Sequence, residues 1–194
     1  GNVAGIEIEN SRHAIVEGNY AHDNTSGILV FITPGLPIKT TYDVIVRNNF
    51  VIGNNHPNFG AAGSIVAGVP AGTGMLIMAA DDVKIEGNII RGNDNVGIAI
   101  TDHGHASNLT LDPEAEPNAD QISILGNTMQ DNGRHALDAI KALMLTKLVT
   151  EGADIVRVGE SKGSCILDGE QHLTFGLDDF AQCGFTSTAQ TRTY

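Results

Sequence analysis

The sequence predicts an all-β fold, a right-handed parallel β-helix, and an internal repeat is the main reason for this prediction. The pattern [VI]-x-[GN]-N-x-x-x-[DG]-N occurs four times, at residues 16–24, 46–54, 85–93 and 124–132. A glycine followed by a short apolar segment precedes each copy, at residues 5–8, 27–30, 74–77 and 97–100. Because one such unit cannot bury its apolar face alone, we expect the units to stack as the coils of a solenoid.

Each part of the repeat has a conformational reason. Short runs of Val and Ile with alternating inward positions favour strands. Asn and Gly tolerate left-handed backbone geometry and therefore mark the turns between strands. Equivalent Asn residues of successive coils should stack into a ladder that satisfies the turn amides. Scattered strand–turn segments of a β-sandwich are the alternative, which four matches at every defined position disfavour.

The spacing within the repeat predicts where loops are inserted. The strand glycine and the first asparagine are 14 residues apart in the first coil (5 to 19) and in the third (74 to 88). They are 22 apart in the second coil (27 to 49) and 30 apart in the fourth (97 to 127), which implies insertions of 8 and 16 residues at one turn. These loops cover about 33–42 and 101–120, and a further insertion at 55–72 belongs to a different turn.

Two long loops on either side of a short turn predict a groove, because insertions in solenoids often form the binding face. The floor of this groove would carry Asp81 and Asp82. One wall is the Pro-rich stretch 33–37, and the other wall carries polar side chains from the longest loop, namely Asp102, His103, His105, Asp112, Glu114 and Glu116.

Two kinds of metal site are conceivable in this wall. Carboxylates of Asp112, Glu114 and Glu116 are the ligands that calcium prefers, so this loop is the candidate calcium site. His103 and His105 are candidate ligands for a transition metal, with Asp102 or His56 as a further ligand. A single His-x-His is a weak signal, however, and an exposed polar loop is the simpler interpretation.

The C-terminal part departs from the repeat. Residues 134–150 show helical spacing of apolar side chains, and a helix there could cover the open end of the last coil. Strands are expected again at 154–158 and 164–167. We therefore divide a single domain into β-helix coils at 1–133 and a C-terminal part at 134–194 that comprises the helix, the last strands and a tail.

Composition narrows the partners and the compartment. A formal net charge of −12 argues against nucleic acid and anionic membranes as partners, and no apolar run is long enough to span a membrane. Cys165 and Cys183 would form a disulfide in an exported protein and would be two small apolar residues in a cytosolic one. Because the predicted fold is mostly one of exported proteins, we favour the disulfide.

Several segments carry a resemblance to a known family. The strings GIEIENS, GILVF, NNHPNF and VPAGTG resemble exported bacterial parallel β-helix repeat proteins, whose biochemical role is not settled; here they occupy residues 5–11, 27–31, 54–59 and 69–74. The resemblance implies a periplasmic or extracellular protein, and the two late cysteines are consistent with it. The fold it implies, the pectin-lyase-like solenoid, is shared with pectate lyases, polygalacturonases and alginate epimerases, but a shared fold does not transfer an activity.

The motifs of those enzymes are incomplete in this chain. Asp81 and Asp82 precede the string His103-Gly104-His105 by one coil, but the Asn-Thr-Asp, Gly-His-Gly and Arg-Ile-Lys motifs of polygalacturonase-like hydrolases are absent. The Asp-Pro-His-Glu motif of the epimerases is missing too, and 112–116 offers neither Lys nor Arg as a base. We therefore expect a non-catalytic protein that binds a polysaccharide or another exported protein. A polysaccharide lyase or C5-epimerase is the alternative, with a glycoside hydrolase less favoured.

Overall fold

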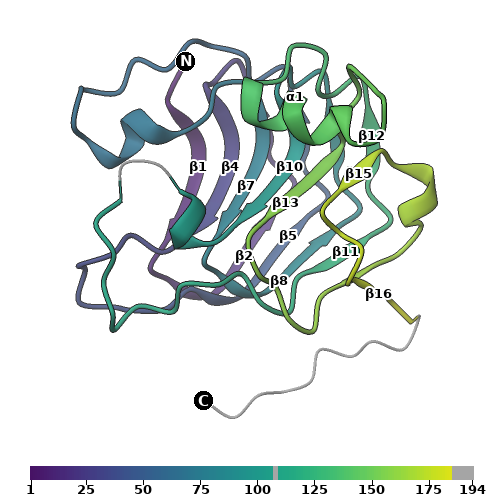
Figure 1. Ribbon diagram of the computed structural model, residues 1–194. Coiled ribbons are helices and arrows are strands. Elements are labelled where there is room, and N and C mark those ends of the chain that lie inside the picture. Colours follow the sequence, from purple (N-terminus) through teal and green to yellow (C-terminus); the bar gives the residue numbers. More distant parts are fainter. Residues whose placement is uncertain (107–108, 185–194) are drawn as a thin grey trace.

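The computed structural model describes residues 1–106 and 109–184, and it confirms the predicted parallel β-helix (Figure 1). Sheet A contains β1 (Ala4–Glu9), β4 (Ser26–Phe31), β7 (Thr73–Met78), β10 (Val96–Thr101), β13 (Ile155–Val158) and β15 (Thr174–Phe175). Sheet B contains β2 (Arg12–Glu17), β5 (Tyr42–Arg47), β8 (Asp81–Glu86), β11 (Ser123–Leu125), β14 (Cys165–Ile166) and β16 (Ala181–Gln182). Sheet C contains β3 (Tyr20–His22), β6 (Phe50–Ile52), β9 (Ile89–Arg91) and β12 (Thr128–Gln130).

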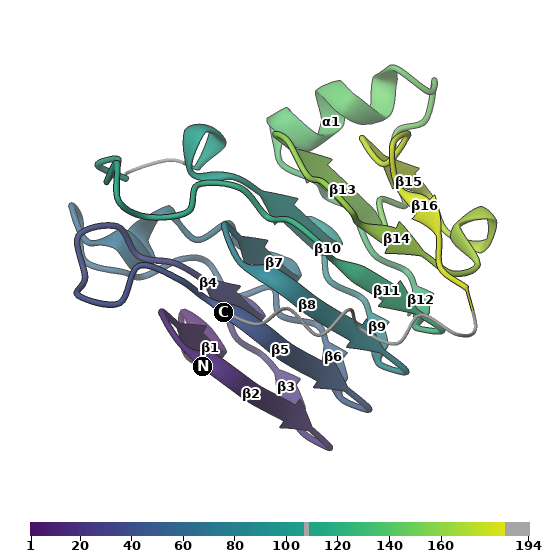
Figure 2. The same cartoon turned by 90° about the horizontal axis from the view of Figure 1, so that it is seen from below.

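In the first four coils the chain visits the three sheets in turn and adds one strand to each sheet per coil (Figure 2). From β13 to β16 it alternates between sheets A and B. All strand pairs are parallel, and their registers align equivalent residues of successive coils; Ile28, for example, lies beside Met75, and Met75 beside Ile98. The predicted return of strands after the helix is confirmed by β13 and β14, which pair with β10 and β11.

The interior of the solenoid is filled by side chains from alternate strand positions. The inner cluster includes Ile28, Met75, Ile98 and Ile155 in register across sheet A. Residues of sheets B and C complete it, among them Val44, Val83, Ile124, Val51 and Ile90. Since side chains of a strand alternate between its two faces, the residue after each of these sheet A positions faces outward.

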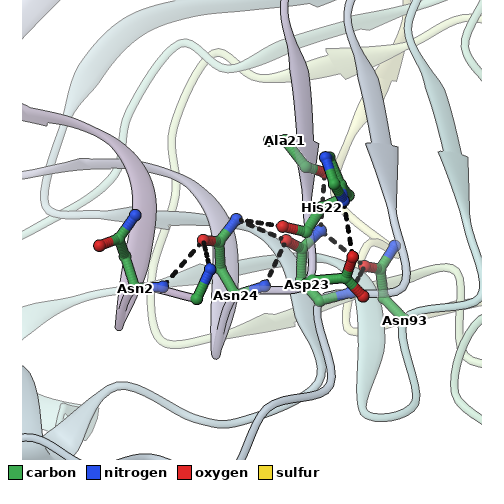
Figure 3. A network of polar contacts seen from close by, with 8 residues as sticks. Asn2, Ala21, His22, Asp23, Asn24 and Asn93 are labelled. Carbon is green, nitrogen blue, oxygen red and sulfur yellow. Dashed lines mark hydrogen bonds and ion pairs between the residues drawn. The ribbon is translucent and has the colours of Figure 1, made fainter.

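The predicted asparagine ladders are present at two corners of the coil. Between sheets B and C, the ladder runs through Asn19, Asn49, Asn88 and Asn127, and the first three each donate from Nδ2 to Oδ1 of the next member over 2.9–3.1 Å. Between sheets C and A, the same bonds link Asn24, Asn54, Asn93 and Asn132. Figure 3 shows the part of this ladder around Asn24 and Asn93. Each Oδ1 also accepts the backbone N–H of the preceding coil, so the ladders satisfy buried turn amides.

The other fixed positions of the repeat have the left-handed backbone that the motif predicts. The residue before each asparagine of the first ladder has φ between 54° and 68° and is Gly18, Asn48, Gly87 or Gly126. The residue before each asparagine of the second ladder has φ between 53° and 64° and is Asp23, Gly53, Gly92 or Asp131. Gly, Asn and Asp are the residues that adopt this conformation at least cost, which explains the alternatives in the pattern.

Close packing requires the glycine at the second position of β1, β4, β7 and β10. A Cβ on Gly27 would lie 2.5 Å from the carbonyl oxygen of Gly74 and 2.9 Å from Nδ2 of Asn54. Gly5, Gly74 and Gly97 are equally close to the carbonyl of the next coil and to their own ladder asparagine. The glycine and asparagine motifs are therefore two halves of one packing arrangement.

The helix is present but shorter than the predicted 134–150. It comprises Asp138–Leu145 (α1) and lies over the outer face of sheet A, beside β10, β13 and β15 (Figures 1 and 2). Met144, on α1, packs against the outward-facing Val156 and Phe175. The helix thus covers a sheet face, and the strands β13–β16 follow at the C-terminal end of the stack.

The predicted disulfide is present near the C-terminus. Cys165 in β14 is bonded to Cys183, 18 residues later, directly after β16. It connects the last two strands of sheet B, which pair with each other over only two residues each. The tail at 185–194 of the predicted C-terminal part lies outside the described residues.

Candidate functional site

The two long loops occupy the corner between sheets A and B, as the spacing predicts, and they contact each other. The loops are residues 32–41, between β4 and β5, and 102–122, between β10 and β11. Nζ of Lys39 lies 2.5 Å from Oδ2 of Asp112, which also accepts the N–H of Gly35 at 2.9 Å. Ile32 and Ala115 join one apolar cluster with Ala79, so the loops meet above the short corner of the middle coil.

The carboxylate of Asp112 is engaged by this contact. The hydrogen bond and charge of Lys39, with the N–H groups of Glu114 and Gly35, lower its pKa to about 2. Oε2 of Glu114 lies 3.9 Å from the same ammonium, and Oε1 of Glu116 accepts the N–H of Asn118. Within residues 1–106 and 109–184, no three His, Cys, Asp or Glu side chains gather as a metal site. In the loop that was the candidate calcium site, the carboxylate of Asp112 is paired with the ammonium group of Lys39.

Asp81 and Asp82 open strand β8 on sheet B. Oδ1 of Asp81 accepts the N–H of Asp120 at 3.0 Å, and the N–H of Asp82 donates to the carbonyl of Asp120 at 3.0 Å. Oδ1 of Asp120 in turn accepts the N–H of Lys162 at 2.7 Å. The side chains of Asp81 and Asp120 thus each accept a backbone N–H of a neighbouring coil, as the asparagines of the ladders do.

The two predicted histidine ligands have different roles. The ring of His103 is buried, and its Nε2 lies 2.9 Å from the carbonyl oxygen of Ile32, so this nitrogen donates and ties the two loops together. The ring of His105 is 55 % exposed, and its Nδ1 lies 2.7 Å from Oδ1 of Asp102. The pair His103 and His105 therefore does not converge on one point.

Asp102 orients His105. Its side chain caps the short helix His103–His105 and accepts both the N–H and the Nδ1 group of His105, at 2.8 and 2.7 Å. Burial raises the pKa of Asp102, but these bonds and the N–H of Glu160 outweigh it and lower the pKa overall. A carboxylate that binds Nδ1–H leaves Nε2 as the basic atom, an arrangement suited to general-base chemistry.

A cavity of about 500 Å³ lies on the outer face of sheet A. Its floor is formed by Leu29, Leu76, Ala99 and Val156, which are neighbours in register across β4, β7, β10 and β13. Its sides come from the segment 65–70, from His105, Ala106 and Leu109, and from helix α1. Most of its surface is apolar, and of the predicted site residues only His105 borders it.

Two loops and the helix shape this cavity because they are insertions into the coil. Residues 53–72, which contain the short helix Ile65–Gly68, and residues 131–154, which contain α1, both connect sheet C to sheet A. They fold back over the outer face of sheet A, whereas minimal coils make this connection in three residues, as at 23–25. The predicted insertion at 55–72 is therefore confirmed, and it contributes one side of the cavity.

Comparison with known proteins decides the family. A model of the right-handed β-helix region matches residues 1–113, more than half of the 194-residue chain. The chain belongs to the right-handed β-helix family. Searches of curated proteins and of solved structures gave no match for it.

The cavity of this β-helix could have been found from its sequence. Strands β4 and β7 read SGILVF and TGMLIM, and every residue in them is buried. Strands β2, β5 and β8 instead carry exposed or partly exposed polar residues on their outer face, such as Glu17, Asp43 and Lys84. A strand with no polar alternation indicates burial on both faces, and hence a covered outer surface on sheet A.

Within the described residues, the only helix of more than four residues is α1, and it is too short to cross a membrane. Its eight residues would extend about 12 Å, less than half the thickness of a hydrocarbon core.

Proposed function

We propose that this protein is a non-catalytic, exported β-helix that binds a small, mainly apolar ligand in the cavity on sheet A. The observation that carries the proposal is the buried apolar floor on a sheet face that points away from the core. Leu29, Leu76 and Met78 are each at most 8 % exposed there, although they lie outside the solenoid. Ligand sites are typically concave, mainly apolar and between about 300 and 1,000 Å³ in volume.

The shape of the insertions supports the same proposal. The segments 53–72, 102–122 and 131–154 exceed what the repeat needs to close a coil, and all three border the cavity. Loops that extend a solenoid on one side often form its binding face. Apolar contacts inside this cavity favour hydrocarbon over sugar, because glycan hydroxyl groups buried there would lose hydrogen bonds to water.

The expected glycan groove between loops 33–42 and 101–120 has less support. The ion pair of Lys39 with Asp112 joins these loops, and Oδ1 of Asp81 already accepts a backbone N–H. A polysaccharide bound along this corner would have to separate the loops first. We therefore place the binding site of the proposal on sheet A.

Export is the second part of the proposal, and the disulfide supports it. Disulfides persist in oxidising compartments and are rare in the cytosol of mesophiles. Cys165 and Cys183 are the only cysteines of the sequence, and they are bonded to each other. Protein isolated from its native cell should therefore show no thiol that reacts with a maleimide before reduction and two after it; two reactive thiols before reduction would contradict export.

A neutral apolar dye tests the binding site. N-phenyl-1-naphthylamine should bind saturably with a rise in fluorescence, and Ala106→Trp, which fills the cavity from the loop, should abolish the rise. Ala62→Trp is the matched control, because Ala62 is exposed in the neighbouring loop and does not border the cavity. Circular dichroism and the melting temperature verify that both variants fold. No saturable binding, or equal binding by Ala106→Trp, would overturn the proposed site.

The oriented pair Asp102 and His105 favours a second candidate function, a polysaccharide lyase or C5-epimerase with His105 as the base. The test is a panel of glycans assayed by ultraviolet absorbance for unsaturated products and by nuclear magnetic resonance for epimerised sugars, with calcium and with a chelator. Product formation that is lost in His105→Ala would establish the enzyme and overturn the non-catalytic proposal. Glycan binding without product would instead move the ligand class from apolar molecules to sugars.

A further inference from the structure

The two ends of the cavity differ in charge. At the end formed by β13 and α1, it is bordered by apolar residues such as Val156 and Ile140. At the opposite end, on the edge strand β1, it is bordered by Glu7, the only carboxylate among its lining residues. Glu7 lies beside Leu29 in the register of sheet A, so an acidic group continues the row that forms the apolar floor.

The carboxylate of Glu7 lacks a positively charged partner in the described part of the chain. Within residues 1–106 and 109–184 it forms no ion pair, whereas the neighbouring Glu9 has a hydrogen bond from Oγ1 of Thr33. Burial by the cavity walls and repulsion from Glu9 both raise the pKa of Glu7. A positive group at this position would stabilise the charged carboxylate and so offset both effects.

The other titratable group among the described lining residues of the cavity is His105. His105 lies on the loop after β10, and this loop reaches back over the sheet, because Nε2 of the nearby His103 lies 2.9 Å from the carbonyl oxygen of Ile32, directly after β4. Nδ1 of His105 is bound by the carboxylate of Asp102, and Glu7 and Glu9 are the charged residues of β1 itself. The formal net charge of −12 adds a field that attracts cations and repels anions.

We propose, building on the proposed function, that the ligand is a small cationic amphiphile whose positive group binds Glu7 and whose apolar chain covers the floor from Leu29 to Val156. The five strands from β1 to β13 span roughly 20 Å, enough for an extended chain of about a dozen carbons. The apolar chain supplies the affinity, and the charge selects the class of ligand and its direction in the cavity.

Three amphiphiles of equal chain length test the proposal by displacement of N-phenyl-1-naphthylamine: octyltrimethylammonium, 1-octanol and octyl sulfate, all below their micellar concentrations. We expect the cation to bind most tightly and the sulfate least. Glu7→Gln should weaken the cation about three- to fivefold, the size expected of a partly exposed ion pair, and leave 1-octanol unchanged. Added salt should reduce the preference of the wild type for the cation.

Glu170→Gln is the matched control, since Glu170 is an exposed carboxylate of the short helix Gly169–Gln171, away from the cavity. It should leave the order of the three amphiphiles unchanged. Equal displacement by the cation and 1-octanol in the wild type would overturn this inference and leave the proposed function standing. A preference for the cation that persists in Glu7→Gln would also overturn it. Failure of the dye itself to bind would overturn the proposed function instead.

Discussion

Nδ2 of Asn88 donates a 2.9 Å hydrogen bond to Oδ1 of Asn127, one coil further along the stack. Oδ1 of Asn88 also accepts the N–H and the Nδ2 group of Asn49, both at 3.0 Å, and all of these groups are buried. Asn88→Ala would leave two donors of Asn49 without an acceptor. We expect it to lower the free energy of unfolding by about 3 kcal/mol, measured by urea denaturation.

Asn19 provides the matched control for this prediction, because it is the first member of the same ladder and is only half-buried. Asn19→Ala removes a donor to Asn49, but water can reach the groups it leaves. The expected loss is about 1 kcal/mol or less. Equal losses for the two variants would show that burial within the ladder does not determine its stability.

The repeat uses glycine for two reasons, close packing at Gly27 and a left-handed backbone at Gly18, and substitutions can distinguish them. Gly27→Ala places a methyl group 2.5 Å from the carbonyl oxygen of Gly74 and 2.6 Å from Cγ1 of Val51, so we expect a loss of at least about 3 kcal/mol. Gly18 has open space around it and a φ of 68°, so Gly18→Ala should cost about 1 kcal/mol. Gly18→Asn should cost less, because Asn48 holds the equivalent position in the next coil. Chemical denaturation of the three variants measures the order, and a small effect of Gly27→Ala would contradict the packing argument.

The repeat could be predicted from the sequence because each of its positions is determined by local backbone geometry. Left-handed turns accept few residue types, and the ladder asparagines must recur in every coil to bond each other. The positions of the inserted loops followed for the same reason, since any departure from the spacing between Gly27 and Asn49 marks an insertion.

The site could not be predicted in the same way, because it depends on how insertions fold back in space. Spacing places the loops that carry Lys39 and Asp112 at one corner, but their direct contact follows from an ion pair 73 residues apart in sequence. The helix was predicted too long since apolar residues beyond Leu145, such as the 92 % exposed Leu148, continue its spacing without being buried. The apolar runs of β4 and β7 did carry a signal for the cavity, namely the absence of polar alternation.

Acid should weaken the contact between the two loops through Asp112. Its pKa falls from an ordinary value of 3.8 to about 2 in the folded protein, so its stabilisation is present above the unfolded pKa and is lost as the pH falls through the folded one. We therefore expect the unfolding midpoint in urea to decrease between about pH 4 and pH 2 in the wild type, and less steeply in Asp112→Asn. Glu114→Gln is the control, since its side chain is 79 % exposed and lies 3.9 Å from the Lys39 ammonium. Parallel pH profiles for the wild type and Asp112→Asn would contradict the assignment.

The disulfide should stabilise the last two coils in particular. Strands β14 and β16 pair over only two residues each, so the disulfide adds a covalent link to a short strand pairing. Closing a loop of this length reduces the entropy of the unfolded chain by an amount worth about 3 kcal/mol. In the double variant Cys165→Ala/Cys183→Ala, amides of β14 and β16 should exchange with deuterium faster, while those of β4, β5 and β7 should exchange as in the wild type. Exchange that accelerates equally in all coils would instead mean that the stack unfolds as one unit, with the disulfide stabilising every coil alike.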